Sequence, residues 1–313
     1  MRLGLVRATG RELQPVEILS YRQYLCAEFA GLAQIMSDFI QGLDGARVRR
    51  GVIASAGFPL EDGTVITSNL PWRLSPRALR DALGLEDLRL VNDFEAVAHA
   101  AALVGDQEVL RLAGPAQVPE RGSILLLGPG TGLGAAVWTP TGDSATVLAT
   151  EAGQAALSVG TELELALLAQ MLKQRSHVSI EHALSGPGLR NLYIALCQLR
   201  KVAPVHTTPA AISAAAAGDD ALARTALEVF CGLLGSTVGD MALLYGITGG
   251  VYLAGGILPR IGEFLLQSSF VARLLNKGAM RAALERLPVR LIEHGQLGVL
   301  GAANWYLSQT AAH

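Results

Sequence analysis

Apolar residues recur along this chain at two spacings, which predict strands and helices in alternation. Short, continuous apolar runs bounded by turn residues predict buried strands, and these runs occupy residues 3–6, 51–55, 88–91, 123–127, 135–138, 251–253 and 288–292. Apolar residues three and four positions apart predict helices, and these segments occupy residues 25–40, 75–83, 94–101, 161–175, 179–184, 189–199, 219–245 and 298–309. Because the two kinds of element alternate throughout, the predicted fold class is α/β.

Length, charge and cysteine content limit the kind of protein. A chain of 313 residues is long enough for about two domains. The net charge is −2 and the basic residues form no stripe, which argues against nucleic acid as a partner. The three cysteines lie far apart, without the spacing of a zinc site. They are typical of reduced, packed thiols in a cytoplasmic protein.

The apolar content of the chain does not predict membrane association. The N-terminus lacks a long apolar stretch behind a basic start, so we expect no signal peptide. The most apolar region, residues 227–257, is interrupted by Asp240 and several glycines. It predicts a buried helix and strand, not a membrane span.

Asn92 and Asp93 lie between the predicted strand at 88–91 and the predicted helix at 94–101. Either residue type commonly caps a helix, so one interpretation is an N-cap and nothing more. The other is an amide and a carboxylate at the carboxyl end of a strand, where open α/β sheets bind ligands. An aspartate in that position can accept a proton from a substrate hydroxyl. These residues alone leave both interpretations open.

A glycine-rich loop, residues 128–134, separates two predicted strands. It fails the dinucleotide-binding fingerprint, because Leu133 stands where a glycine is needed, and it lacks the lysine of a P-loop. We therefore predict a hairpin whose backbone N–H groups and Thr131 hydroxyl can hold a nucleotide phosphate. The alternative is a flexible glycine turn. Four glycines around one threonine favour the phosphate interpretation.

Two other pairs of residues carry weaker signals. Gly255 and Gly256 follow the strand at 251–253 and would let a flat ligand approach the backbone, although a tight strand-to-helix turn is the simpler explanation. Glu151 and Glu181 stand near turns. Carboxylates accept hydrogen bonds from sugar hydroxyls, but either glutamate alone is more often a solvated surface acid.

Several other polar residues receive no functional role. We expect Glu162 and Glu164 to lie on the exposed side of their helix. The histidines have neither metal-ligand spacing nor a clear nucleophile partner. We therefore assign no chemistry to His99, His177, His182 and His294.

Seven longer segments, taken in order, resemble the bacterial glucokinases of the non-ROK type. They are TSNLPW from Thr67, LVNDFEAVAHAA from Leu90, LLLGPGTGLGAAVW from Leu125, EAGQ from Glu151, HVSIEHALSGPGLRNLY from His177, GVYLAGGILPRIGEF from Gly250 and HGQLGVLGAANW from His294. The likeness spans nearly the whole chain, and the segment from His177 is long and specific. ROK relatives carry a cysteine-rich zinc motif, which this sequence lacks.

This resemblance implies the two-domain actin-like (ribonuclease H-like) ATPase fold of the hexokinase superfamily, with a cleft between the domains. It places a small α/β domain at residues 1–105 plus 296–313 and a large α/β domain at residues 106–295. The implied reaction transfers phosphate from ATP, with Mg²⁺, to the 6-hydroxyl of glucose. Family members are often dimers, so a homodimer is implied as well.

The resemblance also implies roles for individual residues. Asp93 would be the base that takes the proton from the sugar 6-hydroxyl. The residues implied to hold the sugar are Asn69, Asn92, Asp93, Glu151, Gln154 and Glu181. The residues implied to hold ATP are Gly128, Gly130, Thr131 and Gly132 at its phosphates, and Gly255 and Gly256 at its adenosine. These roles suit phosphoryl transfer, which needs mainly positioning and charge stabilisation.

Two departures from the family pattern bear on function. Gln154 stands where family members usually have a histidine that contacts the sugar; glutamine can also donate a hydrogen bond, but sugar specificity and affinity stay open. Family chains also begin with a strand and a D-x-G-G-T-N phosphate loop, and Met1 aligns just after that loop. A start codon placed too far downstream would explain this. We favour that explanation because the other site residues are present.

The leading hypothesis is therefore an ATP:glucose 6-phosphotransferase. The alternative is a non-catalytic or weakly active homologue that binds sugar or regulates, because the first phosphate loop is missing. A nicotinamide-dependent oxidoreductase is disfavoured by the failed dinucleotide fingerprint.

Overall fold

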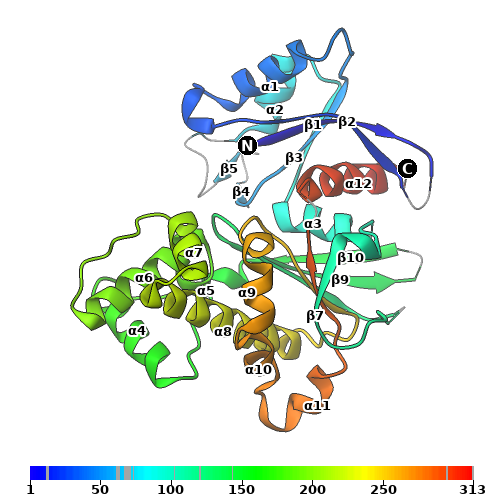
Figure 1. Cartoon of the computed structure of the whole chain (residues 1–313). Coiled ribbons are helices and arrows are strands. Elements are labelled where there is room, and N and C mark those ends of the chain that lie inside the picture. Colours follow the sequence, from blue (N-terminus) through cyan, green and yellow to red (C-terminus); the bar gives the residue numbers. More distant parts are fainter. Residues whose placement is uncertain are drawn as a thin grey trace. The chain divides into compact units, whose positions relative to one another are not determined.

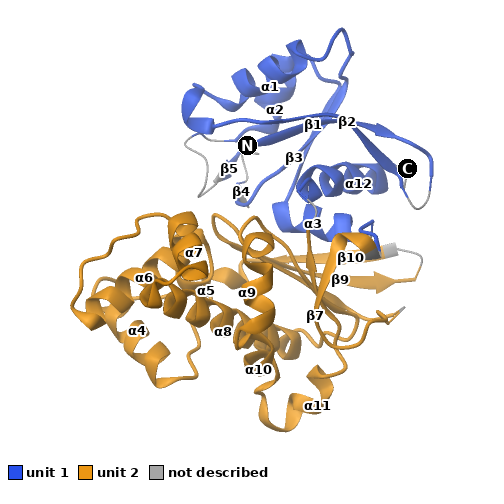
Figure 2. Cartoon of the chain, in the orientation of Figure 1, with its two compact units in different colours: residues 1–105, 294–313 blue, residues 106–293 orange. Residues whose placement is uncertain are grey.

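The computed structural model divides the chain into two compact units (Figure 1). Unit 1 comprises residues 1–105 and 294–313, and unit 2 comprises residues 106–293 (Figure 2). The structure describes every residue except 12–13, 61–63, 67–71, 73, 102, 120, 143, 294 and 312–313. Strands and helices alternate along the chain, so the predicted α/β class is confirmed.

Within its described residues, unit 1 contains three pairs of strands. The antiparallel pairs are β1 (Arg2–Ala8) with β2 (Val16–Gln23), and β4 (Phe58–Pro59) with β5 (Val65–Ile66). The parallel pair is β3 (Arg50–Ala54) with β6 (Asp87–Val91), in a register that sets Ile53 opposite Leu90. The helices are α1 (Leu32–Gln41), α2 (Pro76–Leu83), α3 (Asp93–Ala101) and α12 (Leu297–Ala311).

The first predicted helix, at residues 25–40, is only partly helical. Residues Cys26–Glu28 form a 3-10 turn, and α1 begins at Leu32 after an extended Gly31. The rings of Tyr24 and Phe29 pack edge to face with 5.5 Å between their centroids. This contact packs Phe29 against the residue that follows β2, and the apolar residues before Leu32 do not continue the helix.

The helix α3 is held against α12 by a close backbone approach. A Cβ atom on Gly301 would overlap the carbonyl oxygen of Ala96, so only glycine allows this distance. Next to it, Asn304 Nδ2 donates to the carbonyl oxygen of His99 over 2.9 Å, and Trp305 Nε1 donates to Glu95 Oε1 over 2.8 Å. The C-terminal helix therefore fixes the position of α3 within unit 1.

Unit 2 is built on a six-stranded sheet with the order β10-β9-β8-β11-β12-β7. The strands are β7 (Val109–Ala113), β8 (Ile124–Pro129), β9 (Leu133–Thr141), β10 (Ser144–Thr150), β11 (Gly250–Leu253) and β12 (Val289–Ile292). β11 is parallel to both β8 and β12, whereas β9, β10 and β7 join the sheet antiparallel to their neighbours. The sheet thus places the carboxyl ends of β8 and β11 side by side.

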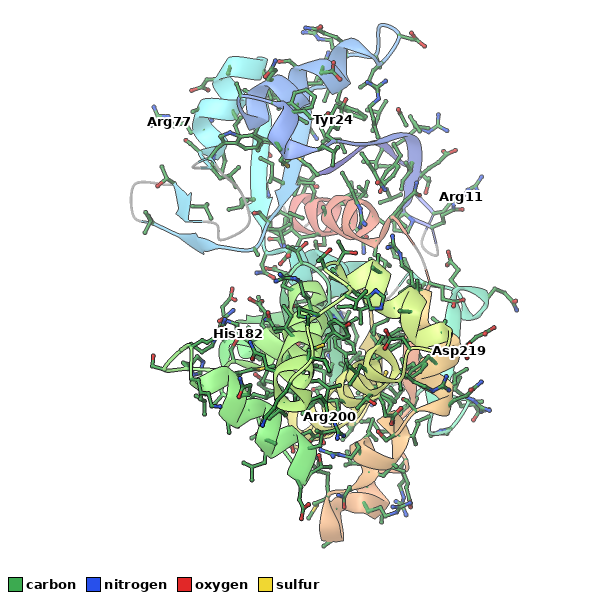
Figure 3. The ribbon with its side chains drawn as sticks, turned by 60° about the vertical axis from the view of Figure 1, so that its left-hand side comes forward. Arg11, Tyr24, Arg77, His182, Arg200 and Asp219 are labelled. Atoms are coloured by element: carbon green, nitrogen blue, oxygen red, sulfur yellow. The ribbon has the colours of Figure 1, made fainter. Side chains whose placement is uncertain are left out.

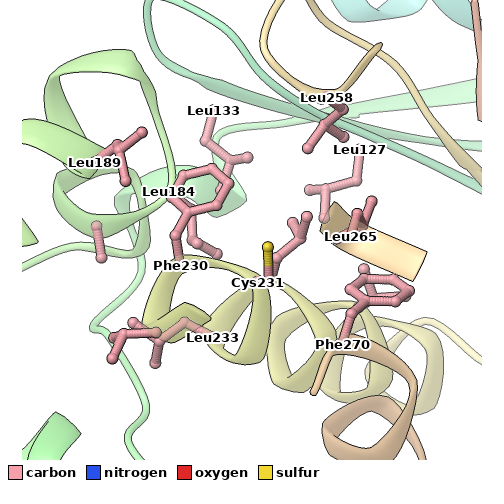
Figure 4. Packing of buried hydrophobic residues seen from close by; sticks show 14 of the residues in the cluster. Leu127, Leu133, Leu184, Leu189, Phe230, Cys231, Leu233, Leu258, Leu265 and Phe270 are labelled. Atoms are coloured by element: carbon pink, nitrogen blue, oxygen red, sulfur yellow. The ribbon is translucent and has the colours of Figure 1, made fainter. Parts of the chain in front are cut away.

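The helices of unit 2 are α4 (Glu162–Leu172), α5 (Ile180–Ala183), α6 (Gly186–Arg200), α7 (Pro209–Ala217), α8 (Ala221–Leu244), α9 (Gly262–Gln267), α10 (Phe270–Leu275) and α11 (Arg281–Leu284). They include one long, buried helix, α8, against which α5, α6, α7 and α10 pack. Phe230 and Cys231 of α8 lie in the main core cluster with Leu127 of the sheet (Figure 4). Among the described helices, α8 alone is long and apolar enough to cross a membrane, but 78% of its most apolar window is buried inside the protein, as in a core helix.

The expectation that Glu164 is a surface acid was wrong. Its side chain is only 4% exposed, and Arg273 of α10 forms an ion pair with it at 2.9 Å. The same oxygen, Oε2, accepts a hydrogen bond from the backbone N–H of Gly160, and Arg273 also donates to Ser236 Oγ. Helical spacing could not reveal this, because the partner arginine lies more than a hundred residues away in the sequence.

Replacement of Gly301 by alanine is expected to destabilise unit 1 by about 1–3 kcal/mol, because the new Cβ must push α12 away from α3. Thermal and urea unfolding of the variant measure this. Gly298→Ala is the matched control in the same helix: no atom lies near its added Cβ, so it should be neutral or stabilise by up to about 1 kcal/mol. Equal stability of the two variants would contradict the close-approach argument.

Glu164→Ala should lower the free energy of unfolding by roughly 3–5 kcal/mol, since it leaves the largely buried guanidinium of Arg273 without its carboxylate. Chemical denaturation is the measurement. The control is Glu162→Ala in the same helix turn, where an exposed acid is removed and a change within about 0.5 kcal/mol is expected. A Glu164→Ala variant as stable as that control would show that the ion pair contributes little.

Candidate functional site

Asn92 follows β6 and caps α3, as a residue of its type at this junction commonly does. Its Oδ1 accepts hydrogen bonds from the N–H groups of Phe94 at 2.9 Å and Glu95 at 3.1 Å. The amide nitrogen of Asn92 has no hydrogen-bond partner among the described residues. Capping therefore uses the oxygen and leaves the nitrogen available as a donor for a ligand.

Asp93 is the first residue of α3, and its carboxylate lies at the helix N-terminus. Asp93 Oδ1 accepts from the N–H of Phe94 over 3.0 Å. Burial raises the pKa of Asp93, while the N–H groups of Phe94 and of Asp93 itself favour the carboxylate and offset part of the rise. A carboxylate whose pKa is raised is a better proton acceptor than an ordinary one.

The glycine-rich loop forms the predicted hairpin. β8 and β9 pair antiparallel up to Pro129 opposite Leu133, and residues 130–132 make the tip. The N–H of Gly130 donates to the carbonyl oxygen of Gly132 over 2.7 Å, which closes the turn. The exposed Thr131 hydroxyl has no partner among the described residues, so it can serve as a donor to a ligand.

The second glycine motif lies directly beside the hairpin. The N–H of Ala254 donates to the carbonyl oxygen of Leu127, which extends the pairing of β11 with β8 by one residue. Gly255 then adopts a φ of +110°, and a Cβ there would overlap the carbonyl oxygen of Pro129. Gly255 and Gly256 are both exposed, so the structure joins the two glycine segments into one open backbone surface.

Glu181 approaches the same hairpin from α5. Ser179 caps α5 through a reciprocal pair of hydrogen bonds with His182, which is labelled in Figure 3. Glu181 Oε2 accepts from the N–H of Leu133 over 2.8 Å, and Glu181 Oε1 accepts from Gln154 Nε2 over 3.2 Å. A carboxylate has about four acceptor positions, so Glu181 keeps capacity for a ligand hydroxyl.

Residues Ala152–Gln154 form a single 3-10 turn beside Glu181. Glu151 precedes the turn as its N-cap residue, and Gln154 ends it. His177 contacts the carbonyl oxygen of Gln154 through Nε2 at 2.9 Å, which fixes the backbone of the turn. The structure thereby groups Glu151, Gln154 and Glu181 on unit 2, whereas Asn92 and Asp93 lie on unit 1.

The N-terminus of α6 adds a further element. Ser185 caps this helix by accepting from the N–H of Gly188 over 2.9 Å, and the next residue, Gly186, donates its N–H to the carbonyl oxygen of Gly130 over 2.8 Å. The first residues of α6 therefore touch the tip of the hairpin. The positive end of the helix dipole favours negative charge nearby, such as a phosphate group.

Within the described part of the chain, the remaining residues considered from the sequence contribute no further contacts to the candidate site. Asn69 and His294 lie outside the described residues. His177 and His182 have structural roles that their spacing did not reveal, apart from the Ser179-x-x-His182 pattern of a capping box.

Within the described ranges, no group of three His, Cys, Asp or Glu side chains could hold a metal ion. Magnesium in kinases is held largely by substrate phosphates with one or two carboxylates, so this arrangement is compatible with Mg–ATP.

Comparison with protein families identifies the chain. A family model described as glucokinase matches residues 1–309. A glucokinase-like protein of Xylella fastidiosa is 56% identical over 312 residues, which cover 99% of this chain and 92% of the relative. The glucokinase of Saccharophagus degradans is 36% identical over 280 residues, covering 89% of this chain and 87% of that protein.

Solved structures agree with these relatives. A glucokinase from an Antarctic psychrotroph superposes with a TM-score of 0.82 at 33% identity and covers 98% of this chain and 95% of its own. A Balamuthia mandrillaris glucokinase in complex with glucose gives a TM-score of 0.81 at 22% identity, with 98% and 91% of the chains covered. A ROK family glucokinase of Streptomyces griseus, in complex with glucose and AMPPNP, gives 0.66 at 21% identity, with 92% of each covered. The chain therefore belongs to the glucokinase family and has the actin-like ATPase fold of these sugar kinases.

Proposed function

We propose that this protein transfers the γ-phosphate of ATP to the 6-hydroxyl of glucose and releases glucose 6-phosphate and ADP. Membership of the glucokinase family over residues 1–309 is the observation that carries the proposal. Two glucokinases with the same fold have been solved with glucose, and one of these also holds an ATP analogue. Family membership supports phosphorylation of a sugar. That the sugar is glucose is the more specific part of the proposal.

Asp93 is the proposed base. Its carboxylate accepts the proton of the 6-hydroxyl as the oxygen of that hydroxyl attacks the γ-phosphorus and the bond to the leaving ADP breaks. The raised pKa of Asp93 favours this role, because a more basic carboxylate takes up the proton more readily. Asn92, the preceding residue, caps α3 through its oxygen, which leaves its amide nitrogen available to donate to the sugar.

The residues of unit 2 hold the two substrates in this proposal. Glu151, Gln154 and Glu181 bind sugar hydroxyls, which donate to carboxylate oxygens or share hydrogen bonds with the amide. Gly128, Gly130, Thr131 and Gly132 face the phosphates, with the N-terminus of α6 adding favourable electrostatics. Gly255 and Gly256 border the adenosine, where the absence of side chains leaves room for a flat ring. Asn69, outside the described residues, is proposed to lie near the sugar.

Mg²⁺ would be held mainly by the phosphates of ATP and would supply neutralisation of their charge. Water must be kept from competing with glucose as phosphate acceptor, a task that substrate-induced closure performs in many kinases. We also propose that the protein acts in the cytoplasm, in the first step of glucose use, and that it forms a homodimer, as the family resemblance implies.

The direct test is formation of glucose 6-phosphate from glucose and Mg–ATP, followed by a coupled assay, with glucose binding measured in parallel by calorimetry. Turnover that depends on glucose supports the proposal. Binding of glucose without turnover would instead favour the sugar-binding or regulatory alternative.

Asp93→Asn should lower kcat by roughly 10²-fold or more, because an amide cannot accept the hydroxyl proton. Glucose affinity should change little, since the amide keeps hydrogen-bonding capacity. Steady-state kinetics and calorimetry on the variant measure the two quantities. Near-normal turnover of Asp93→Asn would remove Asp93 from the base role.

The pH dependence of kcat/KM should reflect the raised pKa of Asp93. Only the ionised carboxylate accepts a proton, so activity should fall as the pH drops through this pKa, and the acid limb should lie above the ordinary aspartate value of about 3.9. Rate profiles between pH 4 and 8 in buffers of constant ionic strength measure it. The residual activity of Asp93→Asn should lack this limb, and persistence of the same limb would assign it to another group.

A further inference from the structure

We propose that Glu181 is a positioning residue for the glycine hairpin, so that the same carboxylate proposed to bind sugar also shapes the surface that receives the nucleotide phosphates. This inference rests on the proposed function only for the identity of the ligands. The role itself, holding residues 130–133 in place, follows from contacts within unit 2.

The first argument is the place of the Glu181 bond at the end of the β8–β9 ladder. Pairing of the two strands ends with Pro129 opposite Leu133, and proline has no N–H to donate. At that point the N–H of Leu133 donates to Glu181 Oε2 over 2.8 Å. Hydrogen bonds to a charged acceptor are stronger than neutral ones, so the carboxylate secures the hairpin where the sheet no longer does.

The second argument is steric. A Cβ on Gly132 would overlap Glu181 Oε2, and a Cβ on Gly153 would overlap the carbonyl oxygen of Leu133. The peptide units on both sides of Leu133 are therefore in close contact with Glu181 and with the turn at 152–154. Such contact leaves the first residues of β9 little freedom to move without moving Glu181.

The third argument is that Glu181 is itself fixed. The fully buried Ser179 caps α5, and the N–H of Ile180 donates to the carbonyl oxygen of Ala155 over 2.9 Å. Leu184 at the other end of α5 is also fully buried and packs in the cluster that contains Leu133 (Figure 4). Two residues further on, Gly186 donates to the carbonyl oxygen of Gly130.

The segment 181–186 thus holds the hairpin on both sides of its tip, through a side chain at Leu133 and through the backbone at Gly130. Between these two points lie the Thr131 hydroxyl and the N–H groups proposed to face phosphate. Gln154 donates to the other oxygen of Glu181, so the turn that carries the sugar-binding residues is part of the same chain of hydrogen bonds. A change at Glu181 should therefore alter nucleotide binding even when no sugar is present.

The first test needs no ligand and no activity: amide hydrogen exchange of the hairpin, resolved to Leu133. Glu181→Ala should speed exchange at Leu133 about tenfold or more, because its N–H loses its acceptor. Glu181→Gln should exchange at a rate close to that of the parent protein. The oxygen of the new glutamine can accept the N–H of Leu133, and its NH₂ group can donate to the side-chain oxygen of Gln154 once the amide of Gln154 has rotated. The control Glu162→Ala removes an exposed acid elsewhere in unit 2 and should leave exchange unchanged. Unchanged exchange in Glu181→Ala would overturn the proposal.

The second test measures ATP binding by calorimetry in the absence of sugar. Glu181→Ala should weaken ATP binding about tenfold and Glu181→Gln about threefold or less, at equal thermal stability. Gly132→Ala, whose Cβ must displace the carboxylate, should weaken it as well, and adding it to Glu181→Ala should have a smaller effect than it has alone. ATP binding of Glu181→Ala equal to that of the parent protein would contradict the nucleotide part of the inference.

The two tests also separate this inference from the proposed function. If the parent protein binds no ATP at all, the proposed function fails, while the exchange experiment still decides whether Glu181 positions the hairpin. If the parent protein binds ATP and phosphorylates glucose but Glu181→Ala shows parental exchange at Leu133, the function stands and the positioning role falls.

Discussion

The hydrogen bond from the N–H of Leu133 to the carboxylate of Glu181 ties the glycine hairpin of unit 2 to the segment that begins with α5. A hairpin tip made of glycine and threonine has almost no side chains with which to hold its own shape. One internal hydrogen bond, from Gly130 to Gly132, closes the turn, and the segment 181–186 adds contacts from outside the hairpin. Leu184 of this segment packs in the core cluster that also contains the buried residues of α8. The position of the hairpin therefore depends on that packing.

In unit 1, too, the position of a candidate site residue depends on contacts with another segment of the chain. Asp93 owes its position to α3, and α3 is fixed by α12, which comes from the other end of the chain. The close approach of Gly301 to Ala96 brings the two helices together, and Trp305 and Asn304 add directional hydrogen bonds. The site residues of both units therefore depend on glycine positions where any side chain would force the elements apart.

Much of the candidate site was predictable because its signals are local. Asn92 caps α3, which was one of the two interpretations that its position allowed, and the strand–glycine–strand pattern around Gly130 does form a hairpin. The long motif from His177 carries enough specific residues to point to the glucokinase family, to which the chain belongs. By contrast, the helix predicted from residue 25 starts only at Leu32, because the packing of Phe29 on Tyr24 overrides the apolar spacing.

The sequence by itself determined the α/β class, the family and the residue types that can accept protons and hydrogen bonds. These depend on patterns within a few residues or on long, specific motifs. Only the tertiary structure decided that Glu164 is buried against Arg273, that Gly255 lies against Pro129, and that Glu181 meets Leu133 and Gln154. Each of these contacts joins residues far apart in the chain. Their energies depend on distance and burial in space, and no spacing along the sequence encodes those quantities.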